Sequence, residues 1–235
     1  MLLSILRQDM PLAQKVLIFG AIIITSLISL TVHEYSHGYV AYRSGDNTAR
    51  NLGRLTLNPL SHLDIIGTLM MLVFGFGYAK TVPINPRNFN HYKRDLAFVS
   101  LAGPVSNLLL ALLMDILFRI TAVALPEAMQ SSTMFTVWLI FCYYFVILNV
   151  GLAVFNLLPL PPLDGSRVVS VLLPSKIAYY YLKYEQIIMI VVFALLYLGG
   201  LDGILGFLRS GVIRGMTWLL DLTPLKPGVG SIFFW

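Results

Sequence analysis

Two histidines and a glutamate in an apolar segment are the residues of this chain best suited to chemistry. The stretch His33-Glu34-x-x-His37 places two imidazoles four positions apart, so on a helix both lie on one face. Glu34 lies about 100° around the helix from His33, beside the point where the imidazoles converge. Imidazole nitrogens bind zinc, and a neighbouring carboxylate can take a proton from zinc-activated water. The pattern therefore predicts a zinc site with Glu34 as general base.

Ordinary packing is the alternative explanation for these three side chains. An H-E-x-x-H match arises by chance in soluble sequences, but here the segment from Val16 to Ser44 is apolar around the motif. Ionisable groups at membrane depth are costly unless they serve a function, and leucine or isoleucine would pack better there. The metal site is therefore the favoured interpretation.

The composition indicates a membrane protein. Of the 235 residues, 57% are hydrophobic and 11% are charged, whereas soluble proteins carry about 25% charged residues. Such a chain places most of its apolar surface in lipid. The formal net charge of +5 fits basic cytoplasmic loops better than nucleic-acid binding, because no long basic run is present. We therefore expect the lipid bilayer, and no nucleic acid, among the partners.

Apolar segments divide the chain into predicted helices. The segments lie at about 16–44, 95–123, 134–158, 186–198 and 211–222, with a short, re-entrant segment at 65–78. Alternation at 54–57 and prolines at 80–86 predict a small membrane-associated β element near residues 52–90. We expect an all-α polytopic membrane protein, a bundle of about five to six transmembrane helices with that β element. A single domain is expected to fill residues 1–235, with a zinc-site core at about 15–175 and C-terminal spans at about 186–222.

A third candidate ligand follows the span at 134–158. Three prolines between positions 159 and 162 end that helix and force an extended stretch, and Asp164-Gly165 comes next. Non-helical backbone survives at membrane depth only where it is buried in protein or faces water. Basic residues after it place this end on the cytoplasmic side, the side to which Arg43 assigns the His37 end. We predict Asp164 as the third zinc ligand, with one position open for water; the alternative is that it only caps the next helix.

Other polar residues admit two interpretations each. Asn107, in an apolar span, either holds substrate backbone or bridges helices. His62 and Asp64 could lie near the metal, although a surface histidine and a helix cap explain them as well. Asp115 and Arg119, four positions apart, predict an intrahelical ion pair.

Three motifs together resemble the site-2 protease family of intramembrane zinc metalloproteases. They are His33-Glu34-x-x-His37, Gly103-Pro104-x-x-Asn107 and Asn156-x-x-Pro159-x-Pro161-x-Leu163-Asp164-Gly165. The loop at 57–64 and the stretch at 80–85 resemble those of compact prokaryotic members without a PDZ or CBS domain. The likeness covers about residues 15–200.

The resemblance implies one Zn²⁺ per chain, bound by His33, His37 and Asp164, with Glu34 as general base. The implied enzyme is a zinc metalloendopeptidase that hydrolyses peptide bonds within or near transmembrane segments of membrane protein substrates, in regulated intramembrane proteolysis. It implies a multi-pass protein of a prokaryotic cell membrane, with the active site nearer the cytoplasmic side.

The same resemblance suggests residues that contact the substrate. Asn107 and Asn156 are expected near the scissile bond, where an amide could steady the carbonyl oxygen. An open backbone edge at Val82 and Ile84 could pair with an unwound substrate segment.

Two other functions remain open at this point. A zinc protease acting on soluble or prenylated peptides would take its third ligand from a glutamate on a later helix, and Glu127 and Glu185 lack a motif around them. A non-proteolytic metal-binding membrane protein or transporter would be expected to show several ligand pairs along a pathway. The sequence does not determine the oligomeric state.

Overall fold

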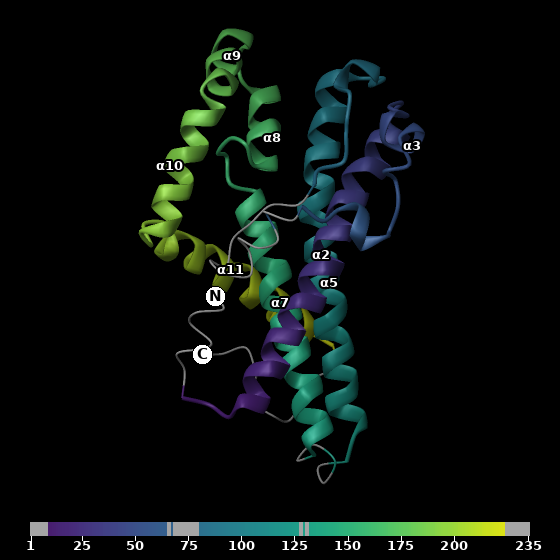
Figure 1. Ribbon diagram of the computed structural model, residues 1–235, viewed down its shortest axis with the longest axis vertical. Helices are drawn as coiled ribbons and strands as arrows, with labels where there is room; N and C mark the ends of the chain where they lie inside the picture. Colours follow the sequence, from purple (N-terminus) through teal and green to yellow (C-terminus); the bar gives the residue numbers. More distant parts are fainter. Residues whose placement is uncertain (1–8, 65–66, 68–79, 127–128, 130–131, 224–235) are drawn as a thin grey trace.

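Helices make up the regular structure that the chain shows. The computed structural model describes residues 9–64, 67, 80–126, 129 and 132–223. Within these residues the elements are α2 Leu12–Arg43, α3 Thr48–Asn51, η1 Pro59–Ser61, η2 Pro86–Asn88, α5 Tyr92–Ala124, α7 Thr133–Asn156, α8 Asp164–Leu172, α9 Ser175–Lys183, α10 Glu185–Tyr197 and α11 Asp202–Asp221 (Figure 1).

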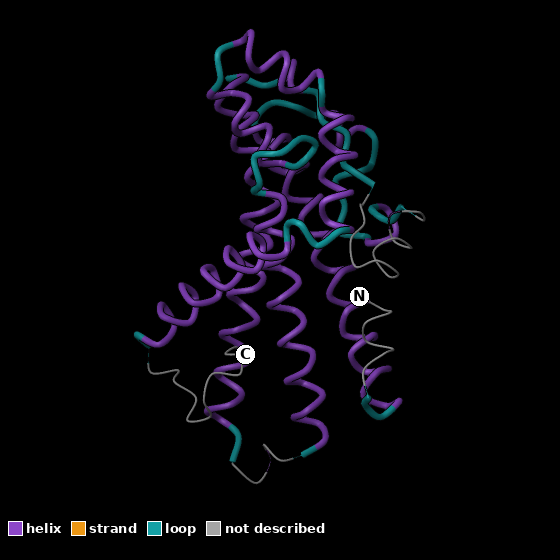
Figure 2. The backbone as a smooth tube through the Cα atoms, turned by 90° about the vertical axis from the view of Figure 1, so that its left-hand side faces the viewer, coloured by secondary structure: helices purple, strands orange, loops and turns teal. Residues whose placement is uncertain are grey.

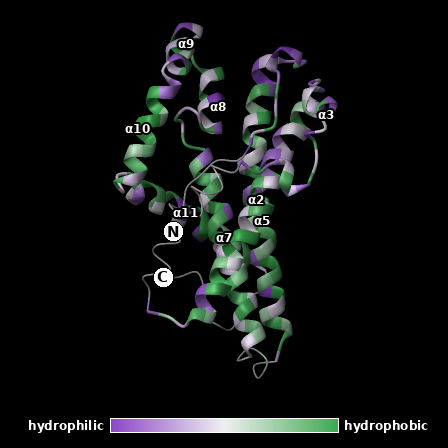
Figure 3. Cartoon of the chain, in the orientation of Figure 1, coloured by the Kyte–Doolittle hydropathy of each residue, from purple (hydrophilic) through white to green (hydrophobic). Residues whose placement is uncertain are grey.

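The three long helices α2, α5 and α7 pack against one another and form the bundle (Figures 1 and 2). They have 32, 33 and 24 residues, and each is long and apolar enough to cross a membrane, because about 20 apolar residues span the hydrocarbon layer. Figure 3 shows apolar residues along the lower part of this bundle and hydrophilic residues gathered at its upper end, near α3 and α9. The chain is a helical membrane protein.

The described residues support fewer spans than the five to six expected. The described residues contain three candidate spans, or four if α9 and α10, which meet at a bend of 58°, count as one. Helix α11 is less apolar because four charged residues lie along it: Asp202, Arg209, Arg214 and Asp221. The C-terminal spans expected at about 186–222 are therefore supported only around α10. The re-entrant segment expected at 65–78 lies outside the described residues, except for Gly67.

The β element expected near residues 52–90 is absent from the described parts of that range, 52–64, 67 and 80–90. The stretch at 80–85 is extended, but among the described residues its backbone groups bond to a loop carbonyl and to side chains and not to a second strand. The Lys80 N–H donates to the His62 carbonyl at 2.9 Å, while the carbonyls of Lys80 and Thr81 accept from Arg54. We call the extended stretch Thr81–Asn85 the strap. Alternation of residue types cannot distinguish it from a paired strand, since both are extended.

Small and β-branched side chains form the contacts between the bundle helices. Ala111 on α5 packs with Val146, Val150 and Val154 on α7 in one buried cluster. A second buried cluster, near the polar end of α2, contains Ala41, Phe89, Leu96 and Val99. This cluster packs Phe89, which follows η2, against α2 and α5. It thereby fixes the position of α5 along the axis of α2.

The predicted ion pair between Asp115 and Arg119 is confirmed, with Arg119 Nε 3.3 Å from Asp115 Oδ1. Arg119 also donates to Asp221 at the end of α11, at 2.7 Å. Both Asp115 and Arg119 are buried. Arg119 therefore bonds within α5 and also connects α11 to the bundle.

Candidate metal centre

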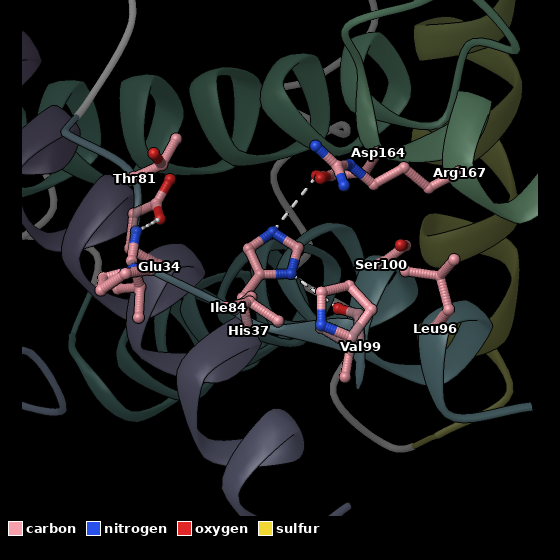
Figure 4. A pocket seen from close by; sticks show the side chains of 12 residues that line it. Glu34, His37, Thr81, Ile84, Leu96, Val99, Ser100, Asp164 and Arg167 are labelled. Atoms are coloured by element: carbon pink, nitrogen blue, oxygen red, sulfur yellow. Dashed lines mark hydrogen bonds and ion pairs between the residues drawn. The ribbon is translucent and has the colours of Figure 1, made fainter. Parts of the chain in front are cut away.

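Three ligand atoms from two distant parts of the chain converge. Helix α2 supplies His33 and His37, whose Nε2 atoms are 3.0 Å apart. Asp164, the first residue of α8, places its Oδ2 at 3.2 Å from His33 Nε2 and 3.3 Å from His37 Nε2. Figure 4 shows His37 between the Asp164 carboxylate and the backbone of Val99. These three residues form a possible metal site, and they are the three ligands that the sequence predicts.

The spacing of these atoms fits a zinc ion. In a tetrahedral site with bonds of about 2.0–2.1 Å, two ligand atoms lie about 3.3–3.4 Å apart, close to the three distances observed. Asp164 Oδ2 is buried and has no hydrogen-bond donor among the described residues. A buried carboxylate oxygen without a donor is costly, and a cation at this point would satisfy it.

Gly103 on α5 leaves the space in which an ion would lie. A Cβ built at this glycine would be 2.4 Å from His37 Nε2 and 2.6 Å from His33 Nε2. Carbon and nitrogen atoms that are not bonded do not approach so closely. Gly103 therefore lets α5 pass directly over the two imidazoles and keeps the space between their nitrogens free.

Hydrogen bonds on the far side of each ring fix which nitrogen faces the site. His37 Nδ1 lies 2.6 Å from the Val99 carbonyl oxygen, and His33 Nδ1 lies 2.6 Å from Asn107 Oδ1. Since both acceptors are oxygens, each Nδ1 must donate its proton. Each Nε2 then presents a lone pair to the site, as a metal-binding histidine does.

The amide of Asn107 is committed to the protein interior. Asn107 is fully buried, and its Nδ2 donates to Asn149 Oδ1 at 2.9 Å and to the Ser29 carbonyl at 3.4 Å. Asn149 in turn donates to the Phe145 carbonyl. The structure thus places Asn107 behind His33, away from any open space. Asn149 was not singled out from the sequence, although a lone amide in an apolar span is a signal that could have found it.

The glycine of the Leu163-Asp164-Gly165 motif allows the turn that presents the aspartate. A Cβ at Gly165 would lie 2.3 Å from the Leu157 carbonyl oxygen and 2.5 Å from that of Leu158. The start of α8 therefore folds back directly on the end of α7. That close approach carries the Asp164 carboxylate to the imidazoles on α2.

Glu34 lines a cavity of about 290 Å³ next to the ligands. Its Oε2 accepts the backbone N–H of Val82 at 2.8 Å. Figure 4 shows Glu34 beside the chain near Thr81, with His37 and Asp164 facing the same space. The lining consists of Glu34, His37, Thr81, Val82, Pro83, Ile84, Pro86, Leu96, Val99, Ser100, Asp164 and Arg167. The candidate base Glu34, the candidate ligands His37 and Asp164, and the residues Val82 and Ile84 expected at the substrate therefore line one cavity.

Three other polar residues do not line this cavity. Asn156 donates from Nδ2 to the Leu152 carbonyl of its own helix at 3.0 Å. His62 is buried, with Nε2 2.8 Å from the Thr56 carbonyl oxygen, and so is not a surface histidine. Asp64 accepts the Gly67 N–H, as a helix cap would.

Replacing Gly103 with alanine is expected to remove the metal. The added methyl would occupy the space between the two Nε2 atoms, so zinc content should fall from about one per chain to near zero. Elemental analysis of the purified protein measures this. The matched control is Gly151→Ala, where a Cβ would meet only Arg209 Cδ at 3.8 Å; a metal loss equal to that of Gly103→Ala would contradict the assignment.

Replacing Asn107 with leucine is expected to weaken zinc binding without abolishing it. The change leaves the His33 Nδ1–H without an acceptor, and loss of such a partner typically costs about 10- to 100-fold in metal affinity. Titration with a competing chelator gives the affinity. Asn156→Leu, which removes an amide that does not touch His33, should leave it unchanged; equal affinities in all three proteins would show that Asn107 does not orient the ligand.

Comparison with known proteins agrees with this chemistry. The model of peptidase family M50 matches residues 120–199, a range that contains Asp164. The chain is 45% identical over 158 residues to YwhC of Bacillus subtilis (strain 168), named as a zinc metalloprotease, which covers 65% of this chain and 69% of YwhC. It is also 32% identical to Rip2 of Mycolicibacterium smegmatis over 153 residues and to Rip2 of Mycobacterium tuberculosis over 154 residues. Both are named as zinc metalloproteases, and each match covers 63% of this chain and 55% of Rip2. No solved structure matches the chain.

The matched length and identity to YwhC, together with the family match, decide the assignment. The chain belongs to the site-2 protease family of intramembrane zinc metalloproteases, peptidase family M50.

Proposed function

We propose that this protein is a zinc metalloendopeptidase that hydrolyses peptide bonds within or near transmembrane segments of other membrane proteins. The observation that carries the proposal is the convergence of the His33, His37 and Asp164 ligand atoms beside a cavity that the Glu34 carboxylate also lines. A transporter or passive metal binder has no need of Glu34 at that position. Family membership also disfavours that alternative.

The ligand set leaves a clear role for each side chain. His33, His37 and Asp164 would hold the zinc ion, and each imidazole would offer Nε2 because its Nδ1–H is bonded to an oxygen. The chemistry that zinc supplies when bound in such a site is the activation of water and the polarisation of a carbonyl group. Everything else in the reaction depends on residues of the chain.

Glu34 moves the proton. Its Oε2 accepts the Val82 N–H, which leaves Oε1 to take a proton from the attacking water as the new C–O bond forms. The same oxygen then delivers that proton to the amide nitrogen of the substrate as the C–N bond breaks. The products are a new carboxyl end and a new amine end, so atoms and protons balance.

The extended stretch Thr81–Asn85 offers a backbone edge to the substrate. Alternate residues of an extended chain face the same side, and Val82 and Ile84 both line the cavity. Among the described residues, the Val82 carbonyl and the Ile84 N–H have no hydrogen-bond partner. A transmembrane helix must unwind before hydrolysis, and pairing with this edge would replace the backbone hydrogen bonds that it loses.

The two asparagines expected at the substrate receive different roles here. Asn107 is assigned to orienting His33, since its amide is buried and fully engaged. Asn156 at the end of α7 remains a candidate for contact with the scissile carbonyl, although its amide would first have to release the Leu152 carbonyl.

The metal site is proposed to lie within the membrane, near its cytoplasmic face, in a multi-pass protein. His37 is six residues before the end of α2 at Arg43, a rise of about 9 Å. The loops at this end carry Arg50, Arg54, Lys80 and Arg87, whereas the loop at 125–132 has no lysine or arginine. Excess positive charge marks cytoplasmic loops.

Replacing Glu34 with glutamine tests the mechanism. Glutamine can still accept the Val82 N–H but cannot take a proton, so cleavage should fall by at least about 10²-fold while zinc content stays unchanged. The assay uses purified protein in detergent with single-span polypeptides whose apolar segment contains an Asn-Pro pair, which favours unwinding. The same polypeptides with Leu-Leu at that position should be cut more slowly.

The matched control for that experiment is Glu185→Gln, which changes a glutamate at the start of α10 outside the cavity. Its cleavage rate should equal that of the unchanged protein, and a chelator should stop cleavage in both. Undiminished cleavage by Glu34→Gln would rule out the proposed base.

A further inference from the structure

The carboxylate of Asp46, outside the metal centre, accepts four hydrogen bonds. It is completely buried, just beyond the end of α2. Its Oδ1 accepts the Thr48 N–H at 3.1 Å, the Thr48 hydroxyl at 2.5 Å and Asn88 Nδ2 at 2.8 Å, while its Oδ2 accepts the Asn85 N–H at 2.7 Å. Two of these three partner residues belong to the far end of the extended stretch Thr81–Asn85 and to η2.

The backbone around Asp46 is shaped to bring these two regions together. Gly45 has a φ of +106°, and a Cβ at this position would lie 2.9 Å from the Asn88 carbonyl oxygen. The Asn90 N–H also donates to the Ser44 carbonyl at 2.9 Å. The turn after the H-E-x-x-H helix and the turn after the strap are therefore built against each other, with Asp46 as the charged group between them.

The strap is held at two further points, one of which is the active site. Arg54 donates to the carbonyls of Lys80 and Thr81 at its near end. In the middle, the Val82 N–H donates to Glu34, and a Cβ at Gly38 would lie 3.0 Å from Val82 Cγ1, so the valine is seated on the turn of α2 that follows His37. Only two residues of the extended chain, Pro83 and Ile84, lie between Val82, which contacts Glu34, and Asn85, which contacts Asp46.

Only a carboxylate can satisfy all the donors at position 46. Burial alone would raise the pKa of Asp46, but hydrogen bonds from Thr48, Asn85 and Asn88 lower it below its ordinary value, so the group is charged at neutral pH. An amide has one acceptor oxygen, and its NH₂ would face either the Asn85 N–H or the donors of Thr48 and Asn88. Loss of the charge should therefore release the strap rather than merely weaken it.

We propose that Asp46 is a positioning residue that holds the strap Thr81–Asn85 against Glu34, and so sets both the orientation of the general base and the place of the substrate-pairing edge. The proposal rests on the proposed proteolytic function for its consequence, but not for its structural content. Displacement of a base or an edge by about 1 Å can cost about 10²-fold in rate. Asp46 acts entirely through the strap, since it touches neither the ligands nor the cavity.

Cysteine labelling tests the structural content without substrate or metal. Val82 is buried, and the chain has a single cysteine, Cys142, which is also buried. In a Val82→Cys protein in detergent, the cysteine at 82 should react slowly with a maleimide; adding Asp46→Asn should raise its rate about tenfold or more, with Cys142 still protected. Cysteine at the exposed Thr81 gives the rate for an open position.

Asp95→Asn is the matched control. Asp95 is also a buried carboxylate, and it accepts a backbone N–H (from His91) at the start of α5, but within the described chain its hydrogen bonds go to His91 and Arg94 and not to the stretch Thr81–Asn85. It should leave the labelling at position 82 unchanged. Unchanged protection of that cysteine in Asp46→Asn, or equal exposure in both variants, would overturn the proposal.

Two further readouts complete the test. If Asp46→Asn also exposes Cys142, the milder Asn88→Ala must expose position 82 selectively, and its failure to do so would overturn the proposal. In the cleavage assay, Asp46→Asn should lower kcat per zinc-loaded molecule about 10- to 100-fold with zinc content unchanged, whereas a residue that only stabilises the fold would leave that kcat intact. Should Glu34→Gln remain active, the proteolytic mechanism fails but the labelling result still decides the role of Asp46.

Discussion

The close passage of α5 over the two imidazoles of α2 is the constraint on which the rest of the structure depends. It is possible only because residue 103 has no side chain, and it places the Val99 carbonyl and the Asn107 amide behind the two rings. Both histidines are thereby fixed in one tautomer before any metal arrives. The free energy for this order comes from apolar packing between α2, α5 and α7, within which the Asn107 and Asn149 amides are hydrogen-bonded to each other.

Two further regions reach the metal centre by different means. The end of α7 and the start of α8 fold back at Gly165, which carries the Asp164 carboxylate to the imidazoles. The strap Thr81–Asn85 reaches Glu34 because side chains, and not a neighbouring strand, take up part of its backbone. The result is a cavity lined by Glu34, by His37 and Asp164 of the candidate metal site, and by Val82 and Ile84 of the extended stretch. This arrangement suits a substrate whose own backbone hydrogen bonds must be replaced while it is cut.

Sequence reasoning gave the ligands and the long helices because these depend on local signals. Spacing alone places His33 and His37 on one face, and three prolines before Asp164 mark irregular backbone at the same membrane side. The partners of Asn107 could not be derived from the sequence, because they depend on how α5 is rotated against α2. The partners of Asp46 could not be derived either, because they depend on how the turn after α2 packs against the turn after the strap. The predicted β element is not found among the described residues since an extended stretch held by side chains has the same residue pattern as a strand. The C-terminal spans are not all supported in the described residues, because α11 carries four charges and α10 has only 13 residues.

X-ray absorption at the zinc edge of the purified protein tests the central claim most directly. The account predicts one zinc per chain, with two imidazole nitrogens and at least one carboxylate oxygen at about 2.0–2.1 Å and no sulfur neighbour. In Asp164→Ala the carboxylate contribution should disappear while both imidazole contributions remain or the metal is lost. A zinc ion with a single imidazole, with a sulfur ligand, or with a ligand shell unchanged by Asp164→Ala would contradict the account.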